Sequence, residues 1–216
     1  MNERDILERT AAHVRQALTA EGSHDWFHVE RVRRTALAIA REEGADLVVV
    51  ELAALLHDLA DWKFAGGDHE AGPRAARAWL ASLAVPAETV EHVCQIIAGL
   101  SFKGAGVATP MTTVEGQCVQ DADRLDAIGA IGIARAFAYG GAKERALYDP
   151  DVPPQPHASF EAYKQNAGPT INHFYEKLLL LKDRMNTATG RRLAAARHRF
   201  MEEFLDQFFA EWEGRR

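Results

Sequence analysis

Residues 46–61 have the sequence DLVVVELAALLHDLAD, and this stretch decides the fold class. Its valines could begin a strand, but the continuous apolar length and the leucine and alanine content of its second half favour a buried helix. Asp46 stands where a helix N-cap is expected. His57 and Asp58 end the apolar run. Polar groups placed there are costly to bury unless they find partners, so this pair is the first candidate site.

Helical patterns recur on both sides of this stretch. Apolar residues repeat at three- and four-residue spacing, and Gly44 marks the end of one such segment. Asp68 is expected to cap another. The expected helical segments are 24–43, 47–61, 69–83, a segment around 90–97, 113–139, 171–185 and 187–212. A Pro-rich stretch, YDPDVPPQPHAS at 148–159, predicts a connection of little regular structure.

The composition is that of a folded globular protein. Of 216 residues, 47% are hydrophobic and 26% are charged, and the net charge of −6 gives no sign of a surface for polymeric nucleic acid. The N-terminus has no signal-like apolar region and no stretch reaches the length of a membrane span, so a cytoplasmic protein is expected. The two cysteines, Cys94 and Cys118, lie in apolar helical patterns and are expected in the core. These features predict an all-α, single-domain helical bundle.

Two further residues extend the candidate site to a set of four. His28 lies on an earlier expected helix and Asp123 on a later one. Imidazole nitrogens and carboxylate oxygens both suit a divalent cation. Three helices could therefore converge on one cation, as helical bundles commonly arrange.

Three motifs in order resemble those of the HD-domain superfamily of metal-dependent phosphohydrolases. They are HDWFHVERV at 24–32, ELAALLHDLAD at 51–61 and VQDADRLDAIGAIGIAR at 119–135. The segment HFYEKLLLLKDRMNTATGRRLAAARH at 173–198 is similar to one in a bacterial subfamily with nucleoside-triphosphate pyrophosphatase members. The resemblance implies a metal-binding HD core at 20–140, a Pro-rich connection at 141–169, and C-terminal helices at 170–216 packed on that core.

The resemblance also implies the metal ligands, His28, His57, Asp58 and Asp123. Asp123 is favoured over Asp121 because the family's ligand lies in the segment matched by ADRLD, which leaves Asp121 and Asp126 with supporting roles. Mn²⁺ or Mg²⁺ is the expected metal, and the mixed nitrogen and oxygen ligands also suit Co²⁺ or Ni²⁺.

Two residues near the ligands are candidates for a catalytic role. Asp61 lies three residues beyond Asp58, which places both on nearly the same helix face. Related enzymes can use an acid at this position to activate water, and a surface salt bridge is the alternative. His24 lies one turn before His28 and is expected to support the site or contact substrate, with helix capping as the alternative.

A second metal ion is not expected. Some HD proteins use two further histidines between the HD pair and the final aspartate, and His69 resembles the first of them. The second is expected after QIIAG, where this chain has Leu-Ser-Phe at 100–102. His92 comes too early to replace it. His69 could instead lie near the substrate.

Phosphate binding calls for cations, because lysine and arginine donate charge-assisted hydrogen bonds to phosphate oxygens. The candidates for substrate binding are Arg31, Lys63, His69, Lys103 and Arg124. Each of the cations could equally be a solvated surface charge.

The expected reaction is hydrolysis of (deoxy)nucleoside triphosphates to monophosphate and pyrophosphate, which the subfamily resemblance implies. The alternatives are a nucleotide phosphomonoesterase, a cyclic-nucleotide phosphodiesterase and a non-catalytic nucleotide sensor. The expected partner is a small phosphorylated substrate, with the chain a monomer or a homodimer. Residues 149–158 could form a lid over the site or an idle loop.

Overall fold

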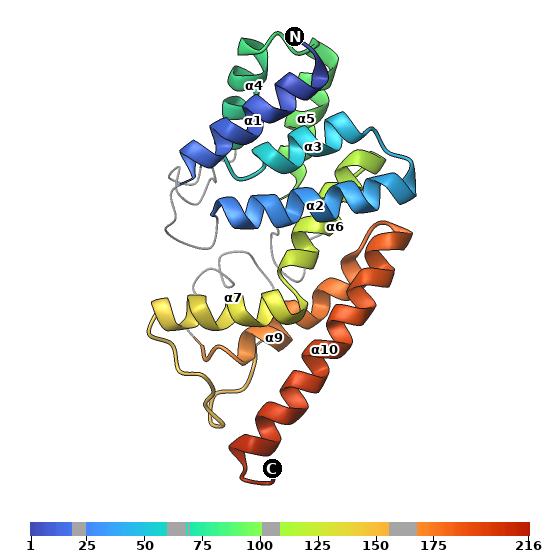
Figure 1. Cartoon of the computed structure of the whole chain (residues 1–216). Helices are drawn as coiled ribbons and strands as arrows, with labels where there is room; N and C mark the ends of the chain where they lie inside the picture. The colour runs from blue at the N-terminus through green and yellow to red at the C-terminus, as the bar shows by residue number, and fades with distance from the viewer. Residues whose placement is uncertain (19–24, 60–67, 69, 101–108, 156–167) are drawn as a thin grey trace. The chain divides into compact units, whose positions relative to one another are not determined.

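The computed structural model describes residues 1–18, 25–59, 68, 70–100, 109–155 and 168–216. Every regular element in these residues is a helix (Figure 1), which confirms the all-α prediction. The described residues divide into two compact units. The first contains those of 1–102 and 109–123, and the second contains those of 124–216. That the C-terminal helices pack on the metal-binding core as one domain stays a prediction.

The first unit is built around α3 (Leu47–Leu56). This helix packs against α1 (Glu3–Ala17), α2 (Trp26–Glu43) and α5 (Ala87–Gly99), and α5 packs in turn against α4 (Ala71–Ser82). The last helix of the unit, α6 (Val114–Asp126), continues into the second unit at its C-terminal end. The sequence patterns had not singled out α1.

The central position of α3 follows from its composition, because a helix that is apolar on all sides must be covered on all sides. Its buried residues are Val49, Val50, Leu52, Ala53, Ala54, Leu55 and Leu56. Burying each of the larger side chains contributes roughly 1.5–3 kcal/mol. As predicted, the Asp46 carboxylate caps the helix by accepting hydrogen bonds from the Val48 and Val49 amides. The first part of the quoted stretch is therefore the core helix of this unit. The helix predicted over 47–61 ends earlier, at Leu56, and residues 57–59 form a turn.

The start of α4 differs from the prediction. Asp68 does not cap this helix, which begins at Ala71 after Glu70 and has no side-chain hydrogen bond at its cap. The Asp68 carboxylate instead accepts the Glu70 amide and pairs with Arg74. Asp68 therefore closes a local turn one step before the helix, because its short side chain bonds the backbone two residues on.

The predicted helix at 113–139 is wrong in its continuity. The chain forms two helices, α6 and α7 (Gly129–Ala142), separated at residues 127 and 128. Gly129 adopts a left-handed backbone with φ of 73°. A side chain disfavours that conformation, so the glycine allows the break. The apolar pattern runs through this break, which is why periodicity alone did not reveal it.

The second unit joins α7, the short helix α9 (Asn172–Glu176), a 3₁₀ helix η1 (Leu178–Arg184) and α10 (Ala188–Trp212). The single helix predicted at 171–185 is wrong, because the chain changes from α to 3₁₀ geometry around Lys177. Helix α10 packs against α7 and η1. Its start was predicted correctly, with Thr187 capping the Gly190 amide.

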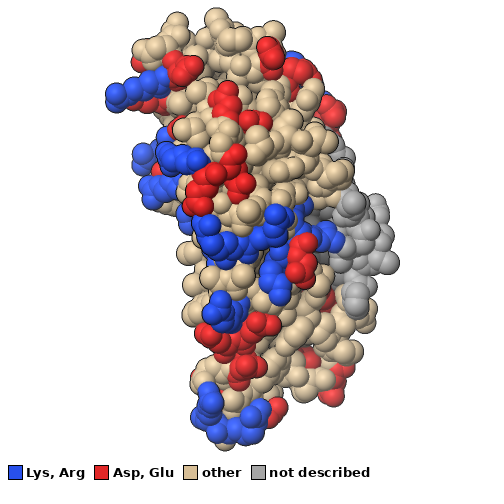
Figure 2. Space-filling model, turned by 90° about the vertical axis from the view of Figure 1, so that its right-hand side faces the viewer, with Lys and Arg blue, Asp and Glu red and all other residues tan. Residues whose placement is uncertain are grey.

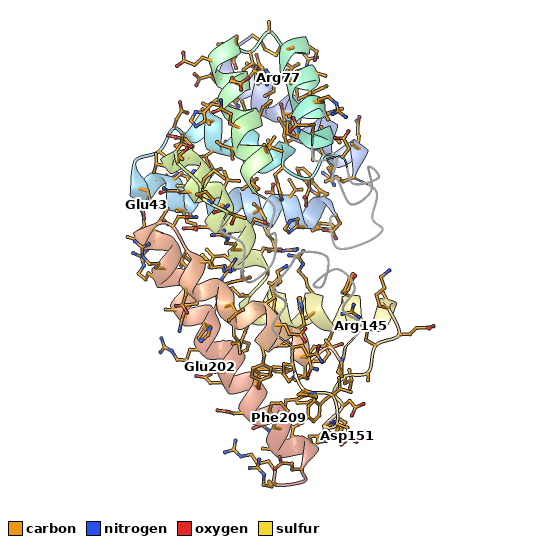
Figure 3. All side chains as sticks on the ribbon, turned by 180° about the vertical axis from the view of Figure 1, so that it is seen from behind. Glu43, Arg77, Arg145, Asp151, Glu202 and Phe209 are labelled. Atoms are coloured by element: carbon orange, nitrogen blue, oxygen red, sulfur yellow. The ribbon has the colours of Figure 1, made fainter. Side chains whose placement is uncertain are left out.

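Aromatic side chains form much of the second unit's core. Phe174 is fully buried, and its ring stacks on Phe204 at 5.8 Å and meets Phe137 at 6.1 Å. Tyr148 contacts the rings of Phe209 and Trp212 at 5.2 Å. In Figure 3, Phe209 and Glu202 lie on opposite sides of α10. One side of this helix is therefore packed and the other faces solvent.

The described part of the Pro-rich connection is held by two buried side chains of α9. Asn172 donates to the carbonyl of Val152, and Glu176 accepts the amide of Gln155. Residues 143–155 contain no helix, as predicted. The predicted lid or idle loop at 149–158 lies partly outside the described residues, which end at 155 in this stretch.

Both cysteines are buried and unpaired, as the sequence indicated. Among the described helices, none combines the length and the apolar character needed to cross a bilayer.

Candidate metal centre

His28 is placed by the first turn of α2. The Asp25 carboxylate caps this helix by accepting the His28 backbone amide at 2.8 Å. The His28 side chain is 2% exposed and lies on the buried face that also carries Val29 and Val32. The cap therefore holds the backbone of the first turn of α2 at His28, whose imidazole enters the core.

His57 and Asp58 follow directly on the end of α3. His57 is the C-cap residue of α3 and keeps helical backbone angles. Its side chain is therefore placed as if it belonged to one more residue of the helix. Its Nδ1 atom lies 2.8 Å from the carbonyl oxygen of Ala54. A carbonyl oxygen only accepts, so Nδ1 carries the proton and the Nε2 lone pair of the neutral ring is available to a metal ion.

Three potential ligand atoms form a nearly equilateral triangle. His28 Nε2 lies 3.3 Å from His57 Nε2 and 3.3 Å from Asp58 Oδ2, and the last two atoms are 3.4 Å apart. Adjacent ligands of a cation with bonds of about 2.1 Å lie about 3.0–3.4 Å apart. Two imidazoles and one carboxylate therefore have the chemistry and the spacing to hold a divalent cation, and within the described part of the chain they form a compact group that could hold one.

Asp123 approaches the same point from α6. Its Oδ1 atom lies 3.5 Å from His28 Nε2, but it does not belong to the compact group of three in the described residues. The Asp123 side chain is 36% exposed, whereas those of His28 and Asp58 are 2% and 11% exposed. Asp123 therefore stands at the solvent side of the cluster.

Comparisons with known proteins agree with this arrangement. The HD domain family model matches residues 26–128. YpgQ of Bacillus subtilis, a protein described as uncharacterized, is 43% identical over 96% of this chain and 94% of its own length. The crystal structure of an HD-superfamily hydrolase from Bacillus thuringiensis has 44% identity and a TM-score of 0.78, covering 99% of this chain and 100% of that one.

The chain belongs to the HD-domain superfamily. Two more solved structures extend the likeness over nearly the whole chain. A Lactobacillus plantarum protein has 40% identity and a TM-score of 0.85, with 99% of both chains covered. Bacillus subtilis YpgQ in complex with ADP has 37% identity and a TM-score of 0.78, covering 98% of this chain and 97% of that one. The family of hydrolases predicted from the three motifs is thereby confirmed.

Of the other predicted catalytic and substrate-binding residues, the structure describes two and leaves five outside the described residues. Arg31 lies one turn beyond His28 on α2 and is half-buried. Arg124 is 8% exposed and its guanidinium donates to the carbonyl oxygen of Arg184. That contact gives Arg124 a structural partner, and its substrate role stays a prediction. Five candidates lie outside the described residues: His24, Asp61, Lys63, His69 and Lys103.

The structure also accounts for residues that the sequence left aside. Asp126 pairs with Arg135, and His92 bonds the Thr113 hydroxyl at 3.1 Å and lies 3.7 Å from Glu115. The pair with Arg135 fits the supporting role expected for Asp126, and His92 has partners on α6 and just before it.

Sequence reasoning missed Gln120, which lies one turn before Asp123 on α6 and is fully buried. Its amide nitrogen donates to the carbonyl oxygens of Gly99 at 3.1 Å and Thr109 at 3.2 Å. Gln120 thus ties α6 to the end of α5 and to the chain just before α6. The one sequence signal was its spacing of three residues from a proposed ligand.

The buried side of α6 is strongly desolvated. Burial raises the pKa of the Cys118 thiol to about 12, and the nearby carboxylates of Glu43, Asp121 and Glu115 act in the same direction. Cys118 therefore stays a neutral thiol at physiological pH. Its fully buried side chain is part of the packed core and offers no thiolate to a metal ion.

Proposed function

We propose that this chain is a metal-dependent phosphohydrolase that cleaves (deoxy)nucleoside triphosphates to monophosphate and pyrophosphate. The observation that carries the proposal is the triangle of His28, His57 and Asp58, with edges of 3.3–3.4 Å. The HD-domain membership supports hydrolysis, and YpgQ, a relative along nearly its whole length, has been crystallised with ADP. Together these favour a nucleotide as the substrate.

In this proposal, His28, His57, Asp58 and Asp123 hold one divalent ion, with Mn²⁺ or Mg²⁺ preferred. A bound divalent ion lowers the pKa of a coordinated water and polarises a phosphoryl oxygen. The ligands divide by exposure. His28 is buried and the side chains of His57 and Asp58 are largely covered, so these three form the closed side of the site, and the half-exposed Asp123 borders the side from which substrate enters.

The chain's own groups supply positioning and proton transfer. The carbonyl of Ala54 holds the His57 ring in one tautomer, and the Asp25 cap holds the first turn of α2. We assign Asp61 as the group that accepts the proton of the attacking water, with His24 supporting it. Arg31, Lys63, His69, Lys103 and Arg124 are the candidates that offset phosphate charge.

The test is a hydrolysis screen with Mn²⁺, Mg²⁺, Co²⁺ and Ni²⁺ against nucleoside tri- and monophosphates and cyclic dinucleotides, resolving pyrophosphate from phosphate. We expect pyrophosphate from triphosphates, and loss of both turnover and bound metal in Asp58→Ala. Asp151→Ala, which removes an exposed carboxylate of the second unit, is the matched control and should retain both. Turnover retained in Asp58→Ala would refute the scheme.

Product analysis also separates the alternatives. Phosphate from monophosphates would identify a phosphomonoesterase, and linear products from cyclic substrates would identify a phosphodiesterase. Tight nucleotide binding without turnover in any metal would favour a sensor, an outcome compatible with the ADP complex of YpgQ.

A further inference from the structure

Phe27 is an exposed aromatic residue beside the candidate metal centre. It directly precedes His28 in the first turn of α2 and is 65% exposed. Among the large apolar residues of the described chain this fraction is the highest, ahead of Met1 at 60% and Leu147 at 55%. Consecutive helical residues are rotated by about 100° around the axis. Phe27 therefore stands at the edge of the buried face on which His28 lies.

The Phe27 ring makes no aromatic or cation–π contact within the described part of the chain. The preceding Trp26, by contrast, is half-buried, and the guanidinium carbon of Arg15 lies 5.9 Å from the centre of its ring. Phenylalanine also gains little here as a helix former, because it ranks below alanine, leucine and the long polar residues. The ring thus neither packs against a neighbouring aromatic nor favours its helix, and its face is open to a ligand.

Arg31 lies on the same side of α2 as Phe27. The two residues are four positions apart, which places their Cβ atoms about 5–6 Å from each other. Helical side chains lean toward the N-terminus, so the half-buried Arg31 extends in the direction of Phe27. A single exposed apolar residue is ordinary elsewhere on a protein surface. Here an aromatic face, a guanidinium and a metal-binding group lie together, and this combination indicates a ligand with one aromatic end and one anionic end.

We propose that Phe27 binds the base of a nucleotide by stacking, while the phosphates reach Arg31 and the metal ion at the triangle of candidate ligands. The inference rests on the proposed function, which supplies both the nucleotide and the metal ion. Base and phosphates are joined through a single sugar ring, so one ligand can contact both side chains. Every base has a π face, so a stacking contact accepts purines and pyrimidines alike. The site therefore distinguishes nucleotides from inorganic phosphates and discriminates little among bases.

A mononucleotide fits this surface better than a nucleic-acid strand. A single strand also stacks on aromatic rings, but its backbone follows a positively charged groove. The face of the molecule in Figure 2 shows basic and acidic groups next to each other, and the net charge of the chain is −6. One aromatic ring beside one metal-binding group matches a ligand with one base.

The experiment compares ADP with inorganic pyrophosphate, which carries two linked phosphates without a nucleoside. Titration calorimetry of the full-length protein with Mn²⁺ measures the affinity for each. In Phe27→Ala we expect the ADP affinity to fall by at least ~5-fold, the lower end of measured stacking contributions, and the pyrophosphate affinity to stay unchanged. CDP should lose affinity as ADP does, because its base also has a π face.

Two conservative variants separate stacking from apolar contact. Phe27→Trp keeps an aromatic face and should bind ADP at least as tightly as the wild type. Phe27→Leu keeps an apolar side chain without a π face and should resemble Phe27→Ala. Leu147→Ala is the matched control, because it truncates another exposed apolar side chain, in the second unit, and should change neither affinity.

The proposal would be overturned by full ADP affinity in Phe27→Ala or Phe27→Leu, by equal losses for ADP and pyrophosphate, or by a wild type that binds no ADP. A loss confined to ADP or to CDP would show readout of one base and would also overturn it. Circular dichroism and the Mn²⁺ affinity of each variant report whether the fold and the metal centre are kept. If Phe27→Ala folds poorly, the pair of Leu and Trp variants still decides. Because these are binding measurements, they stay decisive where the hydrolysis screen fails, so the reaction and the stacking contact are refuted separately.

Discussion

The Nδ1 atom of His57 lies 2.8 Å from the carbonyl oxygen of Ala54, one turn earlier on the same helix. This contact selects the ring nitrogen that faces His28 and Asp58. The last turn of α3 thus fixes the tautomer of the candidate ligand that follows it. Residue 54 holds the His57 ring through its backbone carbonyl, so this role requires no particular side chain at that position.

The proposed ligands should differ in their contribution to metal affinity. Asp58 belongs to the triangle and its side chain is 11% exposed, whereas Asp123 lies 3.5 Å from His28 and is 36% exposed. We expect Asp58→Asn to weaken Mn²⁺ binding by at least ~100-fold and Asp123→Asn by about 10-fold, the scale on which ligand environments affect affinity. Titration calorimetry with Mn²⁺ measures both. Equal losses would contradict the asymmetric geometry.

Two helix caps offer a matched comparison. Asp25 caps α2 and Asp46 caps α3, and each accepts backbone amides at its own helix start. Replacing either with alanine should cost about 1 kcal/mol of unfolding free energy. Asp25→Ala should in addition weaken metal binding, because the capped amide is that of His28. Urea denaturation and calorimetry separate the two effects. Similar metal affinity in both variants would show that the cap does not position the histidine.

Gly129 should tolerate substitution poorly. It has φ of 73°, and a Cβ there would lie 3.0 Å from the Cβ and Cγ atoms of Arg197. We expect Gly129→Ala to lower the unfolding free energy by about 1–2 kcal/mol. Gly141→Ala in the same helix is the control, because its Cβ would meet no atom within 4 Å. That change should be neutral or stabilising by up to about 1 kcal/mol. Thermal denaturation that ranks the two in the opposite order would contradict the left-handed break.

The buried thiols predict a dependence of stability on alkaline pH. The pKa of Cys118 is about 12 in the fold against 9.0 for a free thiol. The raised pKa means that the unfolded state loses its proton first, so stability is fully present below pH 9 and falls as the pH rises toward 12. Cys118→Ser should lessen that fall in urea titrations between pH 8 and 10. Cys94→Ser should lessen the fall as well, since burial also raises the pKa of Cys94. An unchanged alkaline fall in both variants would contradict this origin.

Much of the first unit could be predicted from local sequence because its signals are local. Asp46 and the apolar run of α3 indicate a capped, buried helix, and Gly44 ends α2 with φ of 73°. The cluster of His28, His57 and Asp58 was expected from motif order, and the structure brings these side chains together. Their role as ligands stays a prediction, as does that of Asp123.

Other features depend on tertiary contacts that no local pattern encodes. The break at Gly129 lies in an apolar run that reads as one helix, and its glycine meets Arg197 from far along the chain. The change to 3₁₀ geometry at Leu178–Arg184 occurs among leucines that favour an α-helix in isolation. Gln120 carries no motif, and its two carbonyl partners come from residues 11 and 21 positions away.

The apolar character of α3 has a consequence before folding is complete. The run from Leu47 to Val50 combines high β-propensity with low charge, the composition of segments that aggregate when exposed. Asp46 and Glu51 flank it, and charges at such positions oppose intermolecular strand pairing. We therefore expect Asp46 to oppose aggregation of the unfolded chain, in addition to capping the finished helix. A chain that lost this carboxylate would be expected to yield less soluble protein during synthesis, even where the folded state tolerated the change.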